Sequence, residues 1–524
     1  MSSSRRAFLG TAMRLAGGLA LAACAPGATS APSPSATAIK RGGQLVFADS
    51  GDPKSMDPAL ITNRQGARVL QMMYDPLIDL DADSKLVPAL AESWDVSPDA
   101  KTVTLKLRQG VKFHDGTAFD AQAVKVHFDR HLDPSSKSLR TGELAGVAGV
   151  DAVDSGTVRI RLKDPNPQFL YFLIDWNAFI ESPTALQKYG VDYGAHPVGT
   201  GPFRFVEYAK DDHTLMERNP DYWDKGKPYV DSLKFRVIPT DATRLIELQS
   251  GGAQFAQDPP LQDVQRLSTM SDVKLARRLG GRFSIWFWNI GHSPYADSTE
   301  FRQAVNWALD REGLLKGLFF GSGRLSFAPF HVGTPFDDPG YKPFTRDVTK
   351  AKQLLEAAQR KGLPSPARFP IYTGSAGLYP KIIQIVQSNL ADIGVTVDIQ
   401  QENDAAYNAR TDRNDWHWFI YSGSWSWRPD PSQYLRNLFH SKSTYTLARV
   451  YKDAEIDRLV EQGEQEFSVE KRKTLYRQLA ERLNEFGSSV FAYQDENFVA
   501  LSPKVGGWVF RADGKHHFQN MWLE

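Results

Sequence analysis

The chain has 524 residues, of which 41% are hydrophobic and 23% charged, an ordinary composition for a globular protein. Its 62 basic and 61 acidic residues leave a net charge of +1, so no long-range field would gather polyanions, and nucleic acid is excluded as an expected partner. A single cysteine, Cys24, excludes an internal disulfide framework and metal centres built on several thiolates. The length predicts about three domains or lobes.

The amino-terminal segment has the order of an export signal. The residues Arg5 and Arg6, followed by Phe8 and Leu9, look like a twin-arginine signal. The weakly apolar stretch at 15–23 is far shorter than the roughly 20 residues needed to cross a bilayer. We therefore interpret this segment as a cleaved signal rather than a membrane span.

The cysteine stands where a lipid anchor would be attached. Residues 21–24, LAAC, resemble the bacterial lipobox, in which cleavage exposes the cysteine for lipid attachment. Residues 25–38 consist only of Ala, Pro, Gly, Thr and Ser, which favours a flexible tether. A buried, unreactive Cys24 is the alternative, but nothing around it could form a core. We expect residues 1–23 to be the signal and 24–39 to be the lipidated cysteine with its tether.

The first half of the body mixes strands with loops and helices. Gln44 to Ala48 read as a strand followed by a long polar loop. Residues 101–113 alternate Val and Leu with Thr and Lys, the period-two pattern of a half-buried strand. Residues 158–162 and 233–238 alternate in the same way. The pattern predicts an α/β chain.

The second half gives the clearest local predictions. Residues 296–313 are predicted to form one helix that Asp297 caps and Gly313 ends. A second helix is expected at 347–362, between Asp347 as its cap and Gly362. Strand 369–373, helix 379–392 with its end at Gly394, and strand 395–400 then form one crossover unit, which predicts a partly parallel sheet covered by helices.

No common catalytic motif occurs in the sequence, and we expect no cofactor and no metal. His114 and Asp115 are neighbours in a turn, so their side chains should point in different directions and not work as an acid/base pair. His516 and His517 are predicted to be surface residues.

Seven of the twelve tryptophans lie in two stretches, 283–307 and 415–431. The period-two spacing of Trp286 and Trp288 fits packing on strand faces. Trp425 and Trp427 instead lie on a loop constrained by glycine and proline, where ligand contact is favoured over packing.

The sequence resembles the extracytoplasmic solute-binding proteins of bacterial ABC importers, in the family with dipeptide-, oligopeptide- and nickel-binding members. The resemblance rests on motifs in family order at 74–124, 196–205, 218–238, 289–312 and 390–399. It implies a two-lobed α/β fold of the periplasmic-binding-protein type II class, with a third small domain inserted in the first lobe. The implied boundaries are 40–70, 196–284 and 498–524 for lobe I, 71–195 for the inserted domain and 285–497 for lobe II.

The resemblance also implies a solute site between the lobes, with the loop at 423–431 facing the cleft. Peptide-binding members carry an aspartate where this chain has Trp427, and there it meets the amino terminus of the peptide. A shift of one or two residues could let Asp430 take that place. The residues expected to contact solute are Ser50, Trp286, Trp288, Asn289, Gly423, Ser424, Trp425, Trp427, Arg428 and Asp430.

The implied function is capture and delivery. A lipid-anchored monomer on the outer face of the cell membrane or in the periplasm would bind a small solute and pass it to an ABC permease with its ATPase subunits. A peptide or peptide-like solute is the first expectation, and a sugar, an opine-like compound or a nickel chelate is the alternative. A secreted hydrolase, which would turn its solute over, and an interaction protein with an occluded cleft are the rivals from other classes.

Overall fold

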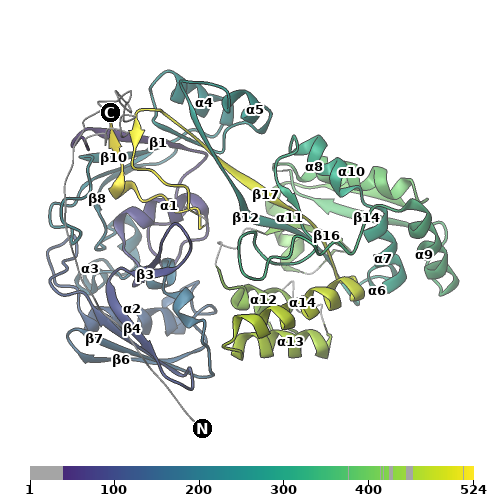
Figure 1. Ribbon diagram of the computed structural model, residues 1–524, viewed down its shortest axis with the longest axis horizontal. Helices are drawn as coiled ribbons and strands as arrows, with labels where there is room; N and C mark the ends of the chain where they lie inside the picture. Colours follow the sequence, from purple (N-terminus) through teal and green to yellow (C-terminus); the bar gives the residue numbers. More distant parts are fainter. Residues whose placement is uncertain are drawn as a thin grey trace, which may run out of the picture. The chain divides into compact units, whose positions relative to one another are not determined.

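The computed structural model describes residues 39–524 except 376, 414, 417, 424–428, 444–451 and 512, and it leaves out the side chains of 280–282, 404, 408, 411, 412, 419–423 and 433 (Figure 1). The predicted signal, Cys24 and most of the tether therefore lie outside the described residues. Residues 40–524 form one compact unit. Among the described residues, no helix combines the length and apolar character needed to cross a bilayer.

Within the described chain, the largest sheet is mixed and has nine strands. Its order is β16-β12-β17-β11-β1-β10-β9-β8, and β13 pairs with β17 at the side. The strands are β1 (Gln44–Asp49), β8 (Phe203–Ala209), β9 (His213–Arg218), β10 (Ser232–Val237), β11 (Phe255–Gln257), β12 (Lys274–Trp288), β13 (Arg324–Leu325), β16 (Trp418–Gly423) and β17 (Ser489–Leu501).

A second, antiparallel sheet lies in the predicted inserted domain, with the order β4-β5-β7-β6. Its strands and the neighbouring elements are β2 (Ile78–Leu80), β3 (Leu86–Pro88), β4 (Ala91–Val96), β5 (Thr102–Leu107), α2 (Ala121–Leu132), β6 (Val147–Asp154) and β7 (Thr157–Leu162). In β5, Val103, Leu105 and Leu107 are buried while the residues between them are more exposed, which confirms the period-two prediction. Helix α2 packs against β6.

The remaining helices and short strands surround these sheets. They are α1 (Arg64–Met73), α3 (Pro183–Tyr189), α4 (Asp241–Gln249), α5 (Val264–Leu267), α6 (Pro294–Asp297), α7 (Thr299–Ala308), α8 (Arg311–Leu318), α9 (Val348–Arg360), β14 (Arg368–Thr373), α10 (Tyr379–Ala391), β15 (Thr396–Gln401), α11 (Asp404–Asp412), α12 (Ser432–Phe439), α13 (Ala454–Gln465), α14 (Val469–Phe486), β18 (Val505–Gly506) and β19 (Trp522–Leu523).

The predicted crossover unit is confirmed. Strands β14 and β15 are parallel neighbours, and α10 between them buries its apolar face, including Ile383 and Leu390. The helix is followed by Gly394 at φ +84°, a left-handed conformation that glycine adopts without steric cost. Helix α9 begins after Asp347, whose carboxylate accepts from the backbone NH of Lys350, also as predicted.

The single helix predicted over 296–313 is wrong. The chain instead forms three helices, α6, α7 and α8, in this stretch. Ser298, not Asp297, caps α7 by accepting from the NH of Phe301, while Asp297 accepts from the NH of Gly291. Asp310 then caps α8 by accepting from the NH of Gly313, so this glycine begins a helix rather than ending one.

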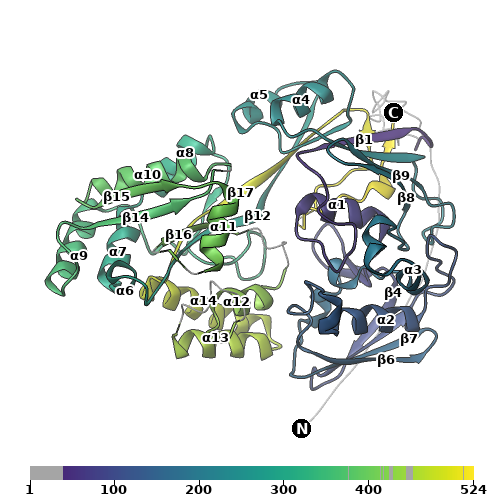
Figure 2. The same ribbon diagram turned by 180° about the vertical axis from the view of Figure 1, so that it is seen from behind.

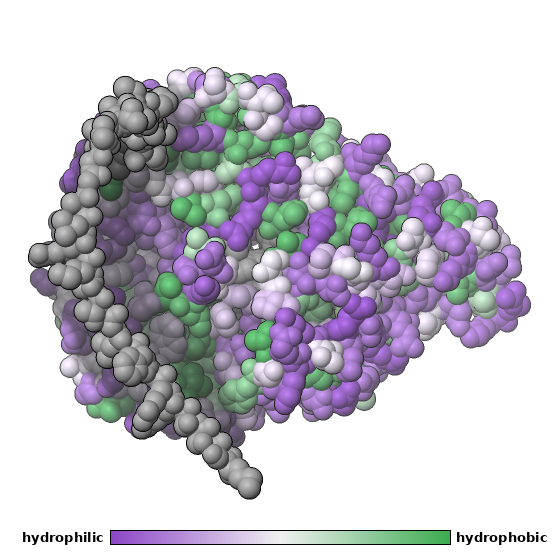
Figure 3. All heavy atoms as spheres, in the orientation of Figure 1, coloured by the Kyte–Doolittle hydropathy of each residue, from purple (hydrophilic) through white to green (hydrophobic). Residues whose placement is uncertain are grey.

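Buried apolar residues form separate cores along the chain. One core is built from residues 77–180, another mainly from 45–74, 179–255 and 499–521, and two more from 283–493. The antiparallel strands β12 and β17 run side by side (Figures 1 and 2). They connect the core that contains residues 45–74 with the two cores built from residues 283–493. The domain boundaries themselves stay a prediction. On the face shown in Figure 3, hydrophilic residues cover most of the surface at the right of the view.

A buried carboxyl group, Asp75, joins α1 to the segment after β9. Its oxygens accept from Tyr222 OH at 2.9 Å, Trp223 Nε1 at 2.7 Å and Thr200 Oγ1 at 3.2 Å. Burial raises the pKa of Asp75 to about 7, although the three hydrogen bonds act to lower it.

Because the pKa of Asp75 is higher in the folded chain, the folded state holds this proton more tightly than the unfolded state. The protonated Asp75 therefore contributes fully to the free energy of unfolding below pH 4. This contribution, up to about 4 kcal/mol, is lost as the pH rises to about 7. We expect Asp75→Asn to remove this loss, so that the variant gains stability relative to wild type between pH 5 and 8. Urea unfolding across that range measures it, and a pH-independent difference would contradict the prediction.

Candidate functional site

The strand order of the large sheet reverses around β1. Strand β1 lies between β10 and β11 and is parallel to both, so the chain returns to the sheet on opposite sides of it. In open α/β sheets, ligands bind outside the carboxyl ends of the strands at such a point. The carboxyl ends here are Asp49, Val237 and Gln257. This edge is the described part of the candidate site.

Ser50, a predicted contact, lies at this edge directly after β1. Its backbone NH donates to Asp49 Oδ1 at 2.7 Å, and its hydroxyl accepts from Gln65 Nε2 at 2.9 Å. The buried Asp49 carboxylate also pairs with Arg68 at 2.7 Å, where Arg68 comes from α1. The loop that carries Ser50 is therefore held to α1 at its start, while Ser50 itself is half-buried.

Three further residues at this edge were not predicted from the sequence. Arg244 on α4 is buried and donates to the carbonyls of Ile238, Gln257 and Asp258 at 2.7 to 3.0 Å, which ties the ends of β10 and β11 together. The Gln257 amide donates to Asp258 Oδ1 at 2.9 Å. Asp258 has φ +48°, a left-handed conformation that is uncommon outside glycine and concentrates at functional sites.

His516 is buried against the same sheet, and its prediction as a surface residue is wrong. Its ring packs on Phe47 of β1 with centroids 5.2 Å apart, and its Nδ1 accepts from Trp508 Nε1 at 3.1 Å. Burial, assisted by the charge of Arg68, lowers the pKa of His516 to about 3. The ring is therefore neutral at physiological pH. His114 and Asp115 point apart as predicted, since His114 Nε2 bonds to the carbonyl of Gly201 while Asp115 accepts from Ser182.

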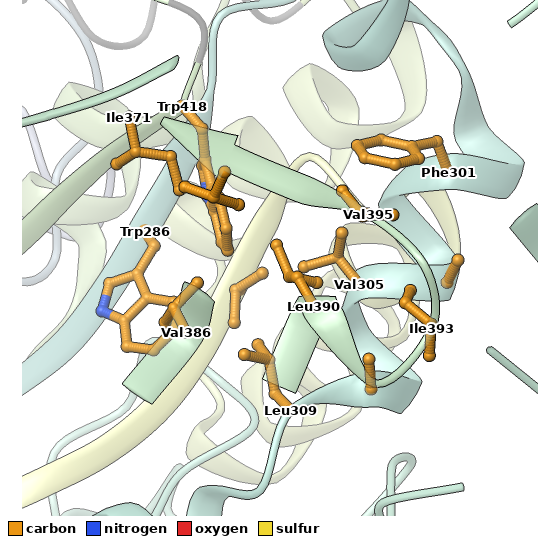
Figure 4. Packing of buried hydrophobic residues seen from close by; sticks show 14 of the residues in the cluster. Trp286, Phe301, Val305, Leu309, Ile371, Val386, Leu390, Ile393, Val395 and Trp418 are labelled. Atoms are coloured by element: carbon orange, nitrogen blue, oxygen red, sulfur yellow. The ribbon is translucent and has the colours of Figure 1, made fainter. Parts of the chain in front are cut away.

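The assignment of Trp286, Trp288 and Asn289 to the solute site requires correction. Both indoles are completely buried, and Trp288 stacks on Trp418 with centroids 4.6 Å apart. Trp286 packs against Trp418 in the same core, with centroids 5.8 Å apart (Figure 4). Asn289 is also buried, and its amide donates to the carbonyl of Trp416 at 2.7 Å. These side chains fill the core of the second half, because both faces of β12 are covered, and they present no surface to a solute.

The predicted solute loop begins at Gly423, the last residue of β16, which pairs with Phe283 of β12. Ser424, Trp425, Trp427 and Arg428 lie outside the described residues.

At the end of the loop, Asp430 is buried and forms an ion pair with Arg472 of α14 at 2.5 Å. Its carboxylate also accepts from the NH and the hydroxyl of Ser432 at 3.0 and 2.6 Å. Arg472 donates in addition to Tyr476 OH and to the carbonyl of Gly463. Asp430 is therefore held by a cation of the protein, which disfavours the expected role as partner of a peptide amino terminus.

Comparison with known proteins places this chain in a family. The family description "Bacterial extracellular solute-binding proteins, family 5 Middle" matches residues 85–446. A glutathione-binding protein GsiB of Pectobacterium atrosepticum is 34% identical over 346 residues, which are 66% of this chain and 66% of that protein. GsiB of Escherichia coli O1:K1 is 32% identical over 68% of this chain and 69% of its own length.

Two solved structures are similar over nearly the whole chain. The periplasmic binding protein DppA of Helicobacter pylori, in complex with peptide STSA, has a TM-score of 0.79 and 26% identity, and the match covers 93% of this chain and 99% of DppA. AgaA of A. tumefaciens R10, in complex with agropinic acid, has a TM-score of 0.80 and 26% identity, with coverage of 92% and 99%. The fold is the two-lobed α/β fold of type II periplasmic binding proteins, and the chain belongs to the bacterial extracellular solute-binding proteins of family 5.

Proposed function

We propose that the protein captures a small peptide or peptide-like solute outside the cytoplasm and delivers it to an ABC permease and its ATPase subunits. The observation that carries the proposal is the family match, which spans 85–446 and so includes the loop at 423–431. The GsiB relatives are glutathione-binding proteins, and the H. pylori neighbour holds a peptide. The proposal includes a lipid anchor at Cys24 that keeps the protein at the membrane surface, where it works as a monomer.

Capture requires no chemistry on the solute. The solute contacts both lobes, stabilises the closed form through its higher affinity for that form, and the closed form docks on the permease. In this proposal the chain passes from one lobe to the other through strands β12 and β17. A shift from 1:99 to 99:1 in favour of the closed form would need about 5.5 kcal/mol of such preference.

The environment of Asp430 narrows the expected solutes. A free carboxylate would recognise the ammonium group of an ordinary peptide through a charge-assisted bond of roughly 1.5–3 kcal/mol. Asp430 is already paired with Arg472, and Trp427 stands where the family aspartate would be. The absence of a free carboxylate at Asp430 favours a peptide-like solute whose amino group is either modified or bound by other residues. The same observation favours an opine-like compound as the second candidate, since AgaA holds agropinic acid.

Calorimetric titration of the intact protein with glutathione, a dipeptide, a tetrapeptide and agropinic acid tests the proposal. We expect one solute to bind with one-to-one stoichiometry, and mass analysis afterwards should recover that solute unchanged. Turnover of the solute would instead support the hydrolase. Failure of every solute to bind, together with an unchanged melting temperature across the panel, would support the interaction protein with an occluded cleft.

Trp427→Ala is expected to weaken binding of the identified solute by at least about tenfold, because a large ring on the solute loop contributes much apolar contact area. Trp427→Phe should recover part of the affinity, since it keeps an aromatic face. Titration calorimetry measures both variants. The melting temperature of the unliganded protein should barely change, and unchanged affinity in Trp427→Ala would show that this ring serves packing.

A further inference from the structure

A group of charged and polar side chains is sealed inside the core between α2 and α3. His127 and His131 lie on α2, and Glu181 precedes α3. All three side chains are 0% exposed. Arg130, also on α2, joins Glu181 to Asp57, which lies in the loop that follows β1 and carries Ser50. This buried group connects the predicted inserted domain to that loop.

The hydrogen-bond partners of His127 require either a second proton or a metal ion at its ring. Nε2 lies 2.9 Å from the carbonyl oxygen of Asn177, and since a carbonyl only accepts, Nε2 carries a hydrogen. Nδ1 is hydrogen-bonded to Oε2 of Glu181. With the proton of the neutral ring already on Nε2, a bare Nδ1 would direct its lone pair at a carboxylate oxygen. A second proton, or a metal ion, must lie between these two atoms.

The charges of the group lead to the same conclusion. Glu181 Oε1 accepts from Arg130 Nη1 at 2.7 Å, and Asp57 accepts from both terminal nitrogens of Arg130 at 2.9 and 2.5 Å. Two carboxylates therefore share one guanidinium, which leaves one negative charge without compensation. Burying an uncompensated charge is costly, and one proton on the pair of His127 and Glu181 makes the group neutral.

The donor atoms of His127, His131 and Glu181 lie within 4.8 Å of one another, so a metal ion is the competing occupant. Two observations favour the proton. Arg130 already places a positive charge on Glu181, where it would repel a divalent ion. The three side chains also have no exposed surface, so a metal ion could reach them only while the chain folds or opens.

We propose that His127 and Glu181 share a buried proton, and that this proton, through Arg130 and Asp57, fastens the loop carrying Ser50 to the inserted domain. The loop is fixed at this end because Asp57 also accepts from the backbone NH of Ala59 at 2.9 Å. Loss of the proton would leave the group with a net negative charge and two acceptor atoms facing each other.

The other ionisable groups around this proton remain in one state near neutral pH. Burial acts to raise the pKa of Glu181, but the charge of His127 and the hydrogen bonds from His127 and His131 outweigh it and hold that pKa well below its usual range. Burial lowers the pKa of His131. Tyr74 and Tyr193, whose hydroxyls are 2.8 Å apart, have pKa values raised by burial.

The remaining neighbours are held by their own partners. Glu143 accepts from Asn177 Nδ2 at 3.0 Å and from Arg140, and His131 Nδ1 is bonded to the hydroxyl of Ser138 at 2.7 Å. The charge balance of the group therefore depends on the proton shared by His127 and Glu181.

Nuclear magnetic resonance of the intact chain with ¹⁵N-labelled histidine tests the protonation directly. His127→Gln identifies the signals of His127, and we expect hydrogens on both of its ring nitrogens at pH 7, with a single hydrogen on the ring of His131. A neutral His127 ring at pH 7 would overturn the proposal. So would metal analysis of the purified protein that finds one transition-metal ion per chain, removed by His127→Gln.

Hydrogen exchange tests the mechanical consequence. In Glu181→Gln the shared proton and one ion pair of Arg130 are lost, so the backbone NH groups of Ala59 and Leu60 should exchange at least about tenfold faster at pH 7. Asp129→Asn, which removes an exposed partner of Lys125 on the same helix, should leave them unchanged. Unchanged exchange in Glu181→Gln would overturn the fastening. If that variant does not fold, Arg130→Gln, which removes both ion pairs of the group, replaces it, and unchanged exchange there would overturn the fastening.

Discussion

Replacing Arg472 by methionine is expected to lower the free energy of unfolding by about 3–5 kcal/mol. The guanidinium is 1% exposed and forms the ion pair with Asp430 at 2.5 Å, while it also donates to Ser432 Oγ and Tyr476 OH at 2.9 and 3.0 Å. Its removal leaves a buried carboxylate without a cation, which costs more than the lost attraction alone. Urea unfolding monitored by fluorescence measures the change.

Two further variants separate this explanation from simple loss of packing. Lys473→Met, the next residue on α14, removes an exposed pair with Glu470 and should cost less than about 1 kcal/mol. The double variant Asp430→Asn with Arg472→Met should recover part of the loss, because the uncompensated charge is gone. A loss of under about 1 kcal/mol in Arg472→Met would contradict the buried ion pair, and no recovery in the double variant would assign the loss to packing.

Acid is expected to destabilise the protein through His516. Since the pKa of this buried ring is about 3, against about 6.5 in the unfolded chain, the unfolded state takes up the proton first as the pH falls. Stability from His516 is present above pH 6.5 and is lost towards pH 3, at about 1.4 kcal/mol per pH unit and up to about 5 kcal/mol in total. His114, whose pKa burial lowers to about 4, contributes in the same direction.

The effect of His516 is isolated by comparing how the unfolding free energies of wild type and His516→Gln change with pH. Between pH 6.5 and 4, the unfolding free energy of His516→Gln should fall less steeply than that of wild type, by about 1.4 kcal/mol per pH unit, which is the slope for uptake of one proton. We expect this difference in slope even though the variant is less stable at pH 7. Parallel profiles for wild type and His516→Gln would show that His516 does not resist protonation in the folded chain.

Local sequence signals predicted those parts of the fold that local contacts decide. The unit β14, α10 and β15 was predicted because its strands, its apolar helix face and Gly394 are all encoded within about 30 residues. The stretch from 296 to 313 was predicted wrongly because Asp297 and Ser298 are both good helix caps. The choice between them depends on the bond from Gly291 to Asp297, which the local pattern does not contain.

The candidate site was predictable only in part. Period-two spacing placed Trp286 and Trp288 on a strand but could not show that both faces of β12 are covered. Gln257 and Asp258 were missed because they meet Ser50 at one edge only when β11 pairs with β1, a contact between distant parts of the chain. Motifs in family order identified the class of protein, since they are specific over the whole body.

Native mass spectrometry of gently purified protein is the most direct measurement of the central claim, which is that the chain encloses a small solute without altering it. We expect a population of molecules heavier than the polypeptide by one small compound, which is released intact on unfolding and rebinds to the emptied protein. A mass equal to the bare chain under all conditions, with no solute able to add to it, would contradict the claim.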